Sequence, residues 1–96
     1  MNDNTVFKFQ LFVAGDTLNS AQAIGNLTDL CGDHLRGRHQ IEVIDVFKEP
    51  ARALAEGIFM TPTLVRLAPG ALLKIVGTLS SSPTLLLALG LKPIVA

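Results

Sequence analysis

The feature that most restricts the fold of this chain is the order in which its hydrophobic period changes. Apolar side chains alternate with polar ones from Thr5 to Val13, as in a strand with one buried face. They recur at three-and-four spacing from Thr17 to Leu35, which indicates an amphipathic helix. A β-branched run from Ile41 to Val46 is then typical of a strand covered on both faces. A strand, a helix and a strand in this order predict a right-handed parallel crossover.

Glycine and proline divide the second half of the chain into shorter segments. Pro50 suits the first turn of a helix, and Gly57 provides its stop. The predicted elements are a helix over Pro50 to Glu56, a strand from Ile58 to Leu67 interrupted by Thr61-Pro62, its antiparallel return over Leu72 to Val76, and a helix capped by Ser80 to Ser82 that continues through Leu91. The complete order, β-α-β-α-β-β-α, is that of thioredoxin. We therefore expect a single α/β, thioredoxin-like domain over residues 1–96.

Charge and hydropathy exclude several partners and compartments. Eight basic and eight acidic side chains cancel, and neither sign forms a run that would neutralise a row of phosphates or match an anionic membrane surface. The longest apolar stretch, Leu85 to Leu91, is interrupted by Gly90 and is far shorter than the roughly 20 residues that span a bilayer. The first residues lack the pattern of a signal peptide. We expect no nucleic acid or membrane as partner, and a cytoplasmic location.

The cysteine content argues against redox chemistry, although the order of elements is that of thioredoxin. Thioredoxins place a Cys-x-x-Cys pair at the start of the first helix, where free amides lower the pKa of a thiol. The matching stretch here is Thr17-Leu18-Asn19-Ser20, and the chain has a single cysteine. Cys31 lies on the apolar stripe of the helix, as expected of an inert core thiol. Disulfide exchange, which needs two thiols, is excluded.

No other pattern predicts catalysis or a cofactor. Cys31, His34 and His39 can be drawn as a metal trio, but a structural zinc site needs four ligands and no fourth is evident nearby. Ser80 to Ser82 lie in no Gly-x-Ser-x-Gly elbow, and no glycine-rich loop is suited to a phosphate. We predict that the chain is not an enzyme and has no catalytic, cofactor-binding or metal-binding residues.

Four blocks of sequence resemble the signature of the KaiB family. They are Leu11 to Thr17 with Asn19-Ser20, Val43 to Val46 with Lys48 and Pro50, Thr61 to Leu64, and Gly77 to Ser80. The blocks follow the family's order with nearly its spacing and cover the chain from about Phe9 to Leu91. This resemblance implies a non-enzymatic regulatory adaptor that docks on a hexameric KaiC-type ATPase and, in cyanobacteria, takes part in the circadian oscillator.

The resemblance also implies a switch between two folds. KaiB proteins rest as a tetramer whose second half is folded differently from thioredoxin, and they bind their partner as a thioredoxin-like monomer. Thr61 and Pro62, which also resemble the cis-proline region of thioredoxins, mark with Gly77 and Thr78 the region expected to rearrange. At Thr61-Pro62 both a cis and a trans bond stay open. Because leucines crowd the second half, we expect the isolated chain to be a tetramer or dimer in the KaiB resting fold, βαββααβ.

Six residues are predicted to contribute to a partner surface, because they occupy the family's matching positions and are expected to be exposed. They are Thr17, Asn19, Ser20, Gln22, Lys48 and Arg66. For Thr17, Asn19 and Ser20, capping of the helix is an alternative role. Basic residues common in the family are replaced here at Gln22, Gly25, Glu42 and Gly57, and each change removes or reverses charge on a surface expected to steer docking.

Two alternative functions stay open. One is a thioredoxin-like sensory domain of the kind found at the amino terminus of SasA-type histidine kinases; we expect no kinase region after Ala96, which favours the adaptor unless the sequence is a fragment. The other is a KaiB-like protein with a different partner. A redox enzyme would need the second cysteine that the chain lacks.

Overall fold

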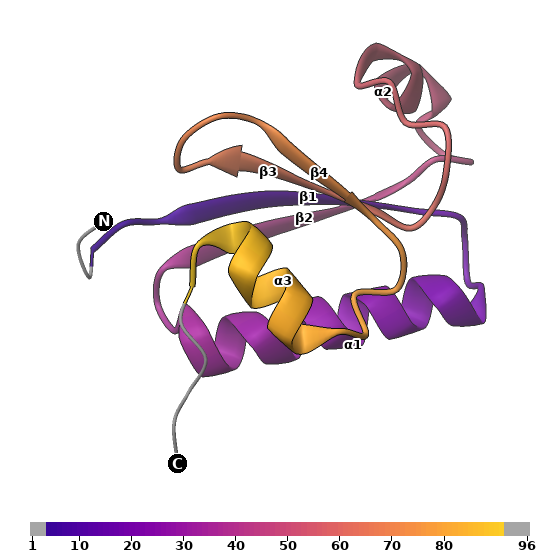
Figure 1. Cartoon of the computed structure of the whole chain (residues 1–96). Coiled ribbons are helices and arrows are strands. Elements are labelled where there is room, and N and C mark those ends of the chain that lie inside the picture. Colours follow the sequence, from indigo (N-terminus) through magenta and orange to yellow (C-terminus); the bar gives the residue numbers. More distant parts are fainter. Residues whose placement is uncertain (1–3, 92–96) are drawn as a thin grey trace.

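The computed structural model describes residues 4–91, and over that range it has the predicted order β-α-β-α-β-β-α (Figure 1). The elements are β1 (Phe7–Val13), α1 (Leu18–His34), β2 (His39–Asp45), α2 (Pro50–Ala55), β3 (Thr63–Ala68), β4 (Leu73–Val76) and α3 (Ser82–Leu89). The thioredoxin-like order is therefore confirmed. The oligomeric resting fold stays a prediction, because the structure contains one chain in the other arrangement.

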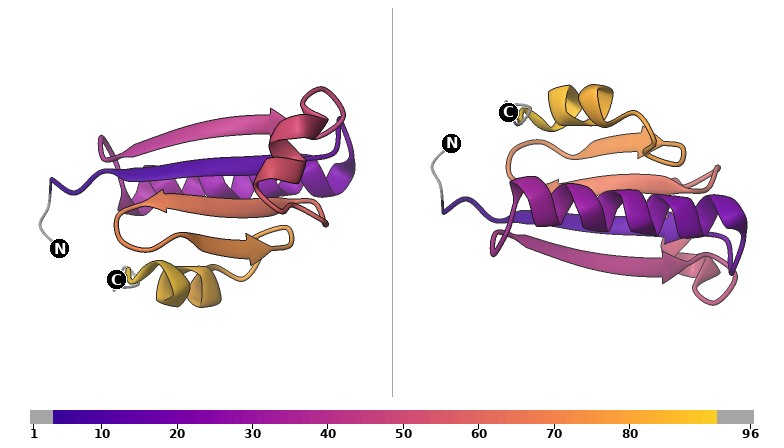
Figure 2. Two further views of the ribbon diagram at one scale, coloured as in Figure 1. Left: turned by 90° about the horizontal axis from the view of Figure 1, so that it is seen from above. Right: turned by 90° about the horizontal axis from the view of Figure 1, so that it is seen from below.

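The sheet has the strand order β2-β1-β3-β4. β1 and β2 are parallel, with Phe7 opposite His39 and Val13 opposite Asp45, so the predicted crossover through α1 is confirmed. β3 runs antiparallel to both β1 and β4. Helices α1 and α3 lie on one face of the sheet, and the short α2 lies on the other (Figures 1 and 2).

Each face of the sheet has its own apolar core. The face toward α1 and α3 buries the alternating side chains that predicted β1, among them Phe7, Leu11 and Val13, against helix residues such as Leu27 and Leu86. The smaller core beneath α2 contains Phe12, Ile44, Ala53, Ile58 and Val65. Successive side chains of β1 point to opposite faces, so Phe7, Phe9 and Leu11 enter the larger core, and the alternation ends at Phe12, which is buried in the smaller core.

Helix α1 begins and ends where the local sequence favours it. The hydroxyl of Thr17, at the N-cap position, accepts a hydrogen bond from the amide of Ser20 at 3.2 Å, which satisfies one of the free amides of the first turn. The amide of Leu35 bonds to the carbonyl of Cys31 at the other end. Asn26 on this helix donates a hydrogen bond at 2.8 Å to the carbonyl of Thr78, which connects α1 to the segment before α3.

The prediction that the second strand is covered on both faces is wrong. β2 lies at an edge of the sheet, only Ile44 in it is buried, and Val43 is 45% exposed. β-branched residues favour strands at the edge as well as at the centre, so the composition of the run did not distinguish the two positions.

The boundaries of two later elements also differ from the prediction. β3 begins at Thr63 and not at Ile58, because Ile58 donates its amide to Ala53 at the end of α2 and so continues the helix exit. Helix α3 ends at Leu89, where Gly90 takes the left-handed conformation typical of a helix stop. Ser81 is at the N-cap position, but its hydroxyl bonds to the hydroxyl of Thr84 at 2.9 Å and caps no amide.

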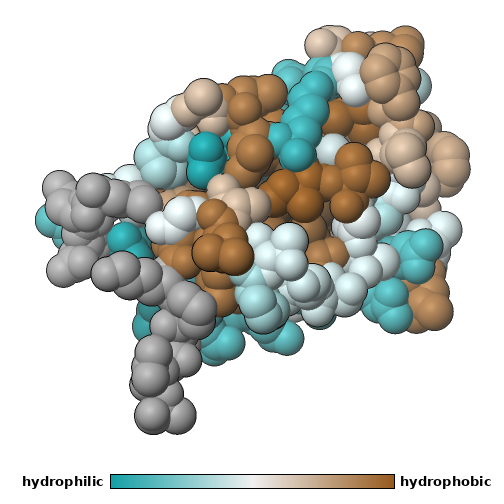
Figure 3. All heavy atoms as spheres, in the orientation of Figure 1, coloured by the Kyte–Doolittle hydropathy of each residue, from teal (hydrophilic) through white to brown (hydrophobic). Residues whose placement is uncertain are grey.

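The leucines of the second half are divided between the core and the surface. Leu79, Leu85, Leu86 and Leu89 are buried, whereas Leu87 is 76% exposed. Figure 3 shows brown apolar side chains on the face formed by the β3–β4 hairpin and α3. The expected excess of apolar surface is therefore present in part. Within the described residues, no helix combines the length and the hydropathy needed to cross a membrane.

Candidate functional site

One end of the sheet gathers four connecting segments. The carboxyl ends of the parallel strands β1 and β2 meet there, and the antiparallel pairing brings Thr63 at the start of β3 beside Phe12 and beside Val76 at the end of β4. Residues 14–17, 46–49, 57–62 and 77–81 therefore lie at this end, which we call the loop end (Figure 2). Most of the residues predicted from the sequence to be functional belong to these segments or to the first turns of α1.

Ser20, at the start of α1, was predicted to be exposed on the partner surface, and this prediction is wrong because the residue is buried. The residue is 1% exposed, and its hydroxyl accepts a hydrogen bond from the amide of Ala14 at 3.1 Å and lies 2.7 Å from the hydroxyl of Thr17. Ser20 therefore stabilises the β1–α1 connection by a hydrogen bond and, being buried, is not exposed to a partner. Thr17, Asn19 and Gln22 are exposed, and of these Thr17 also caps the helix.

Asp45, the last residue of β2, joins two of the connections at the loop end. Its carboxylate accepts hydrogen bonds from the amide of Gly15 at 3.2 Å and from the amide of Phe47 at 2.9 Å. Its carbonyl accepts bonds from the amides of Lys48 and Glu49 at 3.1 and 2.9 Å. The segment that carries the exposed Lys48 is thus a hydrogen-bonded turn.

The region expected to rearrange also lies at the loop end. The Thr61-Pro62 bond is cis, as is the Ala68-Pro69 bond, and the carbonyl of Pro62 accepts a hydrogen bond from the amide of Gly77 at 2.9 Å. Thr78 follows Gly77 and is held through its carbonyl by helix α1. The structure therefore places Thr61, Pro62, Gly77 and Thr78 close together, although 14 residues of chain separate Pro62 from Gly77.

Arg66 is not brought to the loop end. Arg66 lies on β3, opposite Phe9 of β1 and Leu73 of β4, and its Nη2 donates a hydrogen bond at 3.0 Å to the carbonyl of Ala71 in the β3–β4 turn. The side chain is half-buried, and its Nε has no hydrogen-bond partner in the described part of the chain. A partner that contacts Lys48 would reach Arg66 only by extending along the sheet.

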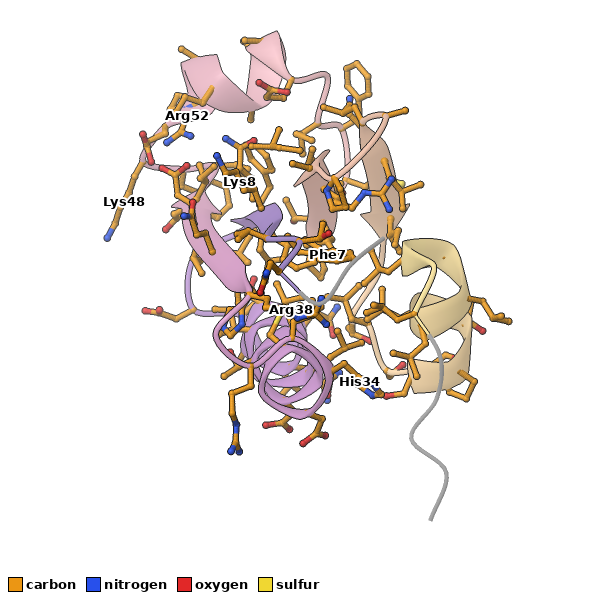
Figure 4. All side chains as sticks on the ribbon, turned by 90° about the vertical axis from the view of Figure 1, so that its left-hand side faces the viewer. Phe7, Lys8, His34, Arg38, Lys48 and Arg52 are labelled. Atoms are coloured by element: carbon orange, nitrogen blue, oxygen red, sulfur yellow. The ribbon has the colours of Figure 1, made fainter. Side chains whose placement is uncertain are left out.

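An ion-pair network beside the loop end was not predicted from the sequence. Arg52 of α2 makes two hydrogen bonds of 2.7 and 2.8 Å to the carboxylate of Glu42 on β2, and a third of 3.3 Å to Glu49. The bonds from Arg52 hold the pKa of Glu42 below its usual range, and those from Glu42 raise the pKa of Arg52. Figure 4 shows Arg52 on the same side as Lys48, whose side chain extends away from the molecule. The acidic replacement at position 42 is therefore partnered within the chain.

Sequence reasoning also missed several exposed apolar side chains at the loop end. Phe47 is 73% exposed and Phe59 is 89% exposed, and Leu18 and Met60 are also exposed. Phe59 and Met60 line a hollow of about 170 Å³, and a larger one of about 330 Å³ lies between the end of β4 and the start of α3. One signal for Phe47 was present in the sequence, because it is the only aromatic residue between Asp45 and Pro50 and is followed directly by the charged residues Lys48 and Glu49.

Cys31 lies far along α1 from the loop end and is fully buried. Burial raises the pKa of its thiol to about 11, so the thiolate needed for nucleophilic attack is not formed near neutral pH. His39 bonds through Nδ1 to the carbonyl of Leu35 at 2.8 Å. Among residues 4–91, no three His, Cys, Asp or Glu side chains gather where they could hold a metal ion.

These features define the class of protein: a thioredoxin-like domain that has Thr17-Leu18-Asn19-Ser20, the N-cap and first turn of its first helix, in place of a cysteine pair. Solved structures agree with this fold. The amino-terminal domain of SasA from Synechococcus elongatus superposes with a TM-score of 0.73 at 19% identity, covering 96% of this chain and 90% of that one. A mutant thioredoxin from Halobacterium salinarum gives a TM-score of 0.71 at 21% identity, covering 98% of this chain and 81% of that one.

Sequence comparison gives the family. The model of the KaiB domain matches residues 10–91. The circadian clock protein KaiB3 of a Synechocystis species is 37% identical over 84 residues, which cover 88% of this chain and 82% of that protein. The circadian clock oscillator protein KaiB of Prochlorococcus marinus is 37% identical over 91 residues, covering 95% and 76%. The chain belongs to the KaiB family.

Proposed function

We propose that this KaiB-family chain is a non-enzymatic regulatory adaptor that binds a KaiC-type hexameric ATPase through its loop end. The observation that carries the proposal is the family match over residues 10–91, together with the exposure of Thr17, Asn19, Gln22 and Lys48 at or beside this end. Neither charge nor composition supports nucleic acid or a membrane as a partner, and we place the adaptor in the cytoplasm.

The proposed mechanism is a population shift between two folds. The partner binds the thioredoxin-like arrangement selectively and draws molecules out of an oligomeric resting state. The supporting feature is the region around Thr61, Pro62, Gly77 and Thr78, where two segments distant in sequence meet through the backbone bond from Gly77 to Pro62, next to the pairing of Thr63 with Val76. Rearrangement of the second half would break this contact and leave the strand–helix–strand unit of the first half intact.

A second candidate function is a sensory module like the amino-terminal domain of SasA. The observation that favours it is the structural superposition over 96% of the chain. Such a module would keep the thioredoxin-like arrangement without a partner and would show no exchange with an oligomer. A pull-down from the native cell with this chain as bait separates the two functions. An adaptor captures a RecA-like ATPase hexamer, whereas a SasA-type sensory module captures histidine kinase components.

The proposed function is tested by binding of the purified chain to the KaiC-type hexamer of the same organism, measured by size-exclusion chromatography with light scattering. The matched variants are Lys48→Ala at the loop end and Lys8→Ala, an exposed lysine near the other end of β1 (Figure 4). We expect Lys48→Ala to weaken the complex and Lys8→Ala to leave it unchanged. Failure of the wild-type chain to bind, or equal losses in both variants, would contradict the proposal.

A further inference from the structure

The loop between β2 and α2 carries an exposed aromatic side chain on a backbone whose amides are hydrogen-bonded. Phe47 donates its amide to the carboxylate of Asp45, and the amides on its two sides, those of Val46 and Lys48, bond to the carbonyls of Val13 and Asp45. Each residue of the segment 46–49 therefore has a bonded amide, although the segment lies at the surface. The backbone that carries Phe47 is therefore fixed by hydrogen bonds before any partner arrives.

The carboxylate of Asp45 bonds to two connections, the β1–α1 connection and the β2–α2 loop. Besides the amide of Phe47 it binds the amide of Gly15 in the β1–α1 connection, so one side chain sets the distance between the two segments. Gly15 has a φ of +60°, and a Cβ placed on it would lie 3.5 Å from the Phe47 ring. The ring thus rests against the backbone of the neighbouring connection, while 73% of the residue stays exposed.

We propose that Phe47 is the apolar anchor of the loop-end surface and that Asp45 is its positioning residue; this inference rests on the proposed function. Aromatic side chains dominate the energetics of protein interfaces when they enter a pocket on the partner. Affinity rises further when the anchor is ordered in the free protein, because little conformational entropy remains to be lost. Phe47 meets the second condition through its hydrogen-bonded backbone, and entry into a pocket on the partner is what the proposal adds.

The positions of Phe47 and Lys48 indicate which kind of surface on the partner would fit them. A pocket lined by apolar side chains and wide enough for a phenyl ring would receive Phe47. Lys48 follows directly, is exposed, and makes no ion pair with the residues that the structure describes, so a carboxylate at the rim of that pocket would complete the match. The occupant is therefore a protein surface with an apolar pocket and an acidic rim.

Phe59 provides a matched control at the same end of the sheet. It is an aromatic residue with a larger exposed fraction, 89%, but no carboxylate bonds to its amide within residues 4–91. If exposed apolar area alone decided binding, Phe59→Ala would cost as much as Phe47→Ala. If the hydrogen-bonded backbone at Phe47 determines affinity, Phe47→Ala loses much more affinity than Phe59→Ala.

The experiment is a double-mutant cycle on binding to the purified KaiC-type hexamer. We expect Phe47→Ala to weaken binding by about tenfold or more and Phe59→Ala by less than about threefold. Asp45→Ala should weaken binding by about tenfold, and Asp45→Asn, whose amide oxygen still accepts both hydrogen bonds, by less than about threefold. In the Phe47→Ala background, Asp45→Ala should add almost nothing, because its effect passes through Phe47.

Additive losses from Asp45→Ala and Phe47→Ala, or a Phe47→Ala variant that binds like the wild type, would overturn the inference while the proposed function stands. A wild-type chain that does not bind the hexamer overturns both the proposed function and the anchor. Amide hydrogen exchange judges the positioning role without any partner: Gly15 and Phe47 should lose protection in Asp45→Ala and keep it in Asp45→Asn. Unchanged protection in Asp45→Ala would refute the role of Asp45.

Discussion

Replacement of Ser20 by alanine tests whether this residue holds the β1–α1 connection or belongs to a partner surface. Ser20 is 1% exposed, and its hydroxyl accepts a hydrogen bond from the amide of Ala14 at 3.1 Å and bonds to the hydroxyl of Thr17 at 2.7 Å. Alanine fits the same space but leaves the Ala14 amide without its acceptor. This bond is part-buried, and a donor left unsatisfied on burial costs about 1 to 3 kcal/mol of unfolding free energy. For a domain of this size that corresponds to a loss of roughly 5 to 20 °C in Tm.

The assay is thermal unfolding followed by circular dichroism, with urea titration to obtain the free energy of unfolding. Asn19→Ala is the matched control, because Asn19 is the exposed neighbour in the same turn, and its Tm should change by no more than the equivalent of about 0.5 kcal/mol. A Ser20→Ala variant with the Tm of the wild type would refute the structural role. Weaker partner binding at unchanged stability would return Ser20 to the partner surface.

Three further outcomes are expected. Cys31, whose pKa burial raises to about 11, should not react with a disulfide reagent at pH 8 until the chain is unfolded, and stability should fall as the pH rises from about 9 toward 11; rapid native-state labelling would contradict this. Because Arg52 lowers the pKa of Glu42, the stability that this carboxylate contributes should be lost as the pH falls through that lowered pKa, so the wild type and Glu42→Gln should converge in acid; a constant difference would contradict it. Phe12→Ala, in the core beneath α2, should cost about 3 to 5 kcal/mol in urea titration, and a loss below about 1 kcal/mol would show that this core does not hold α2.

The order of the elements could be predicted from the sequence because the hydrophobic period changes sharply at each boundary of the first half. Alternation along β1 and the three-and-four spacing of α1 are local properties, and both survive in the folded chain. The position of β2 at the edge of the sheet is not local. It depends on β3 pairing with the other side of β1, and a β-branched run such as Ile41 to Val46 fits either position.

The candidate site was predictable only in part, for a similar reason. Thr17 and Lys48 lie at the loop end because parallel strands place both connections there, which the predicted crossover already required. The burial of Ser20 depends on the path of the backbone at Ala14, and that path is a tertiary feature. Phe47 could not be identified from its residue type alone, because an apolar side chain is usually buried and its exposure follows from the turn that the Asp45 carboxylate stabilises.

The most direct test of the account is an electron cryomicroscopy structure of the chain bound to the KaiC-type hexamer of its own organism. The account predicts the β-α-β-α-β-β-α arrangement in the bound chain, with the loop end against the ATPase, Phe47 inside an apolar pocket and Lys48 facing a carboxylate. A bound chain with its second half in another fold, or one docked through the end of the sheet that carries Arg66 and Ala71, would contradict it.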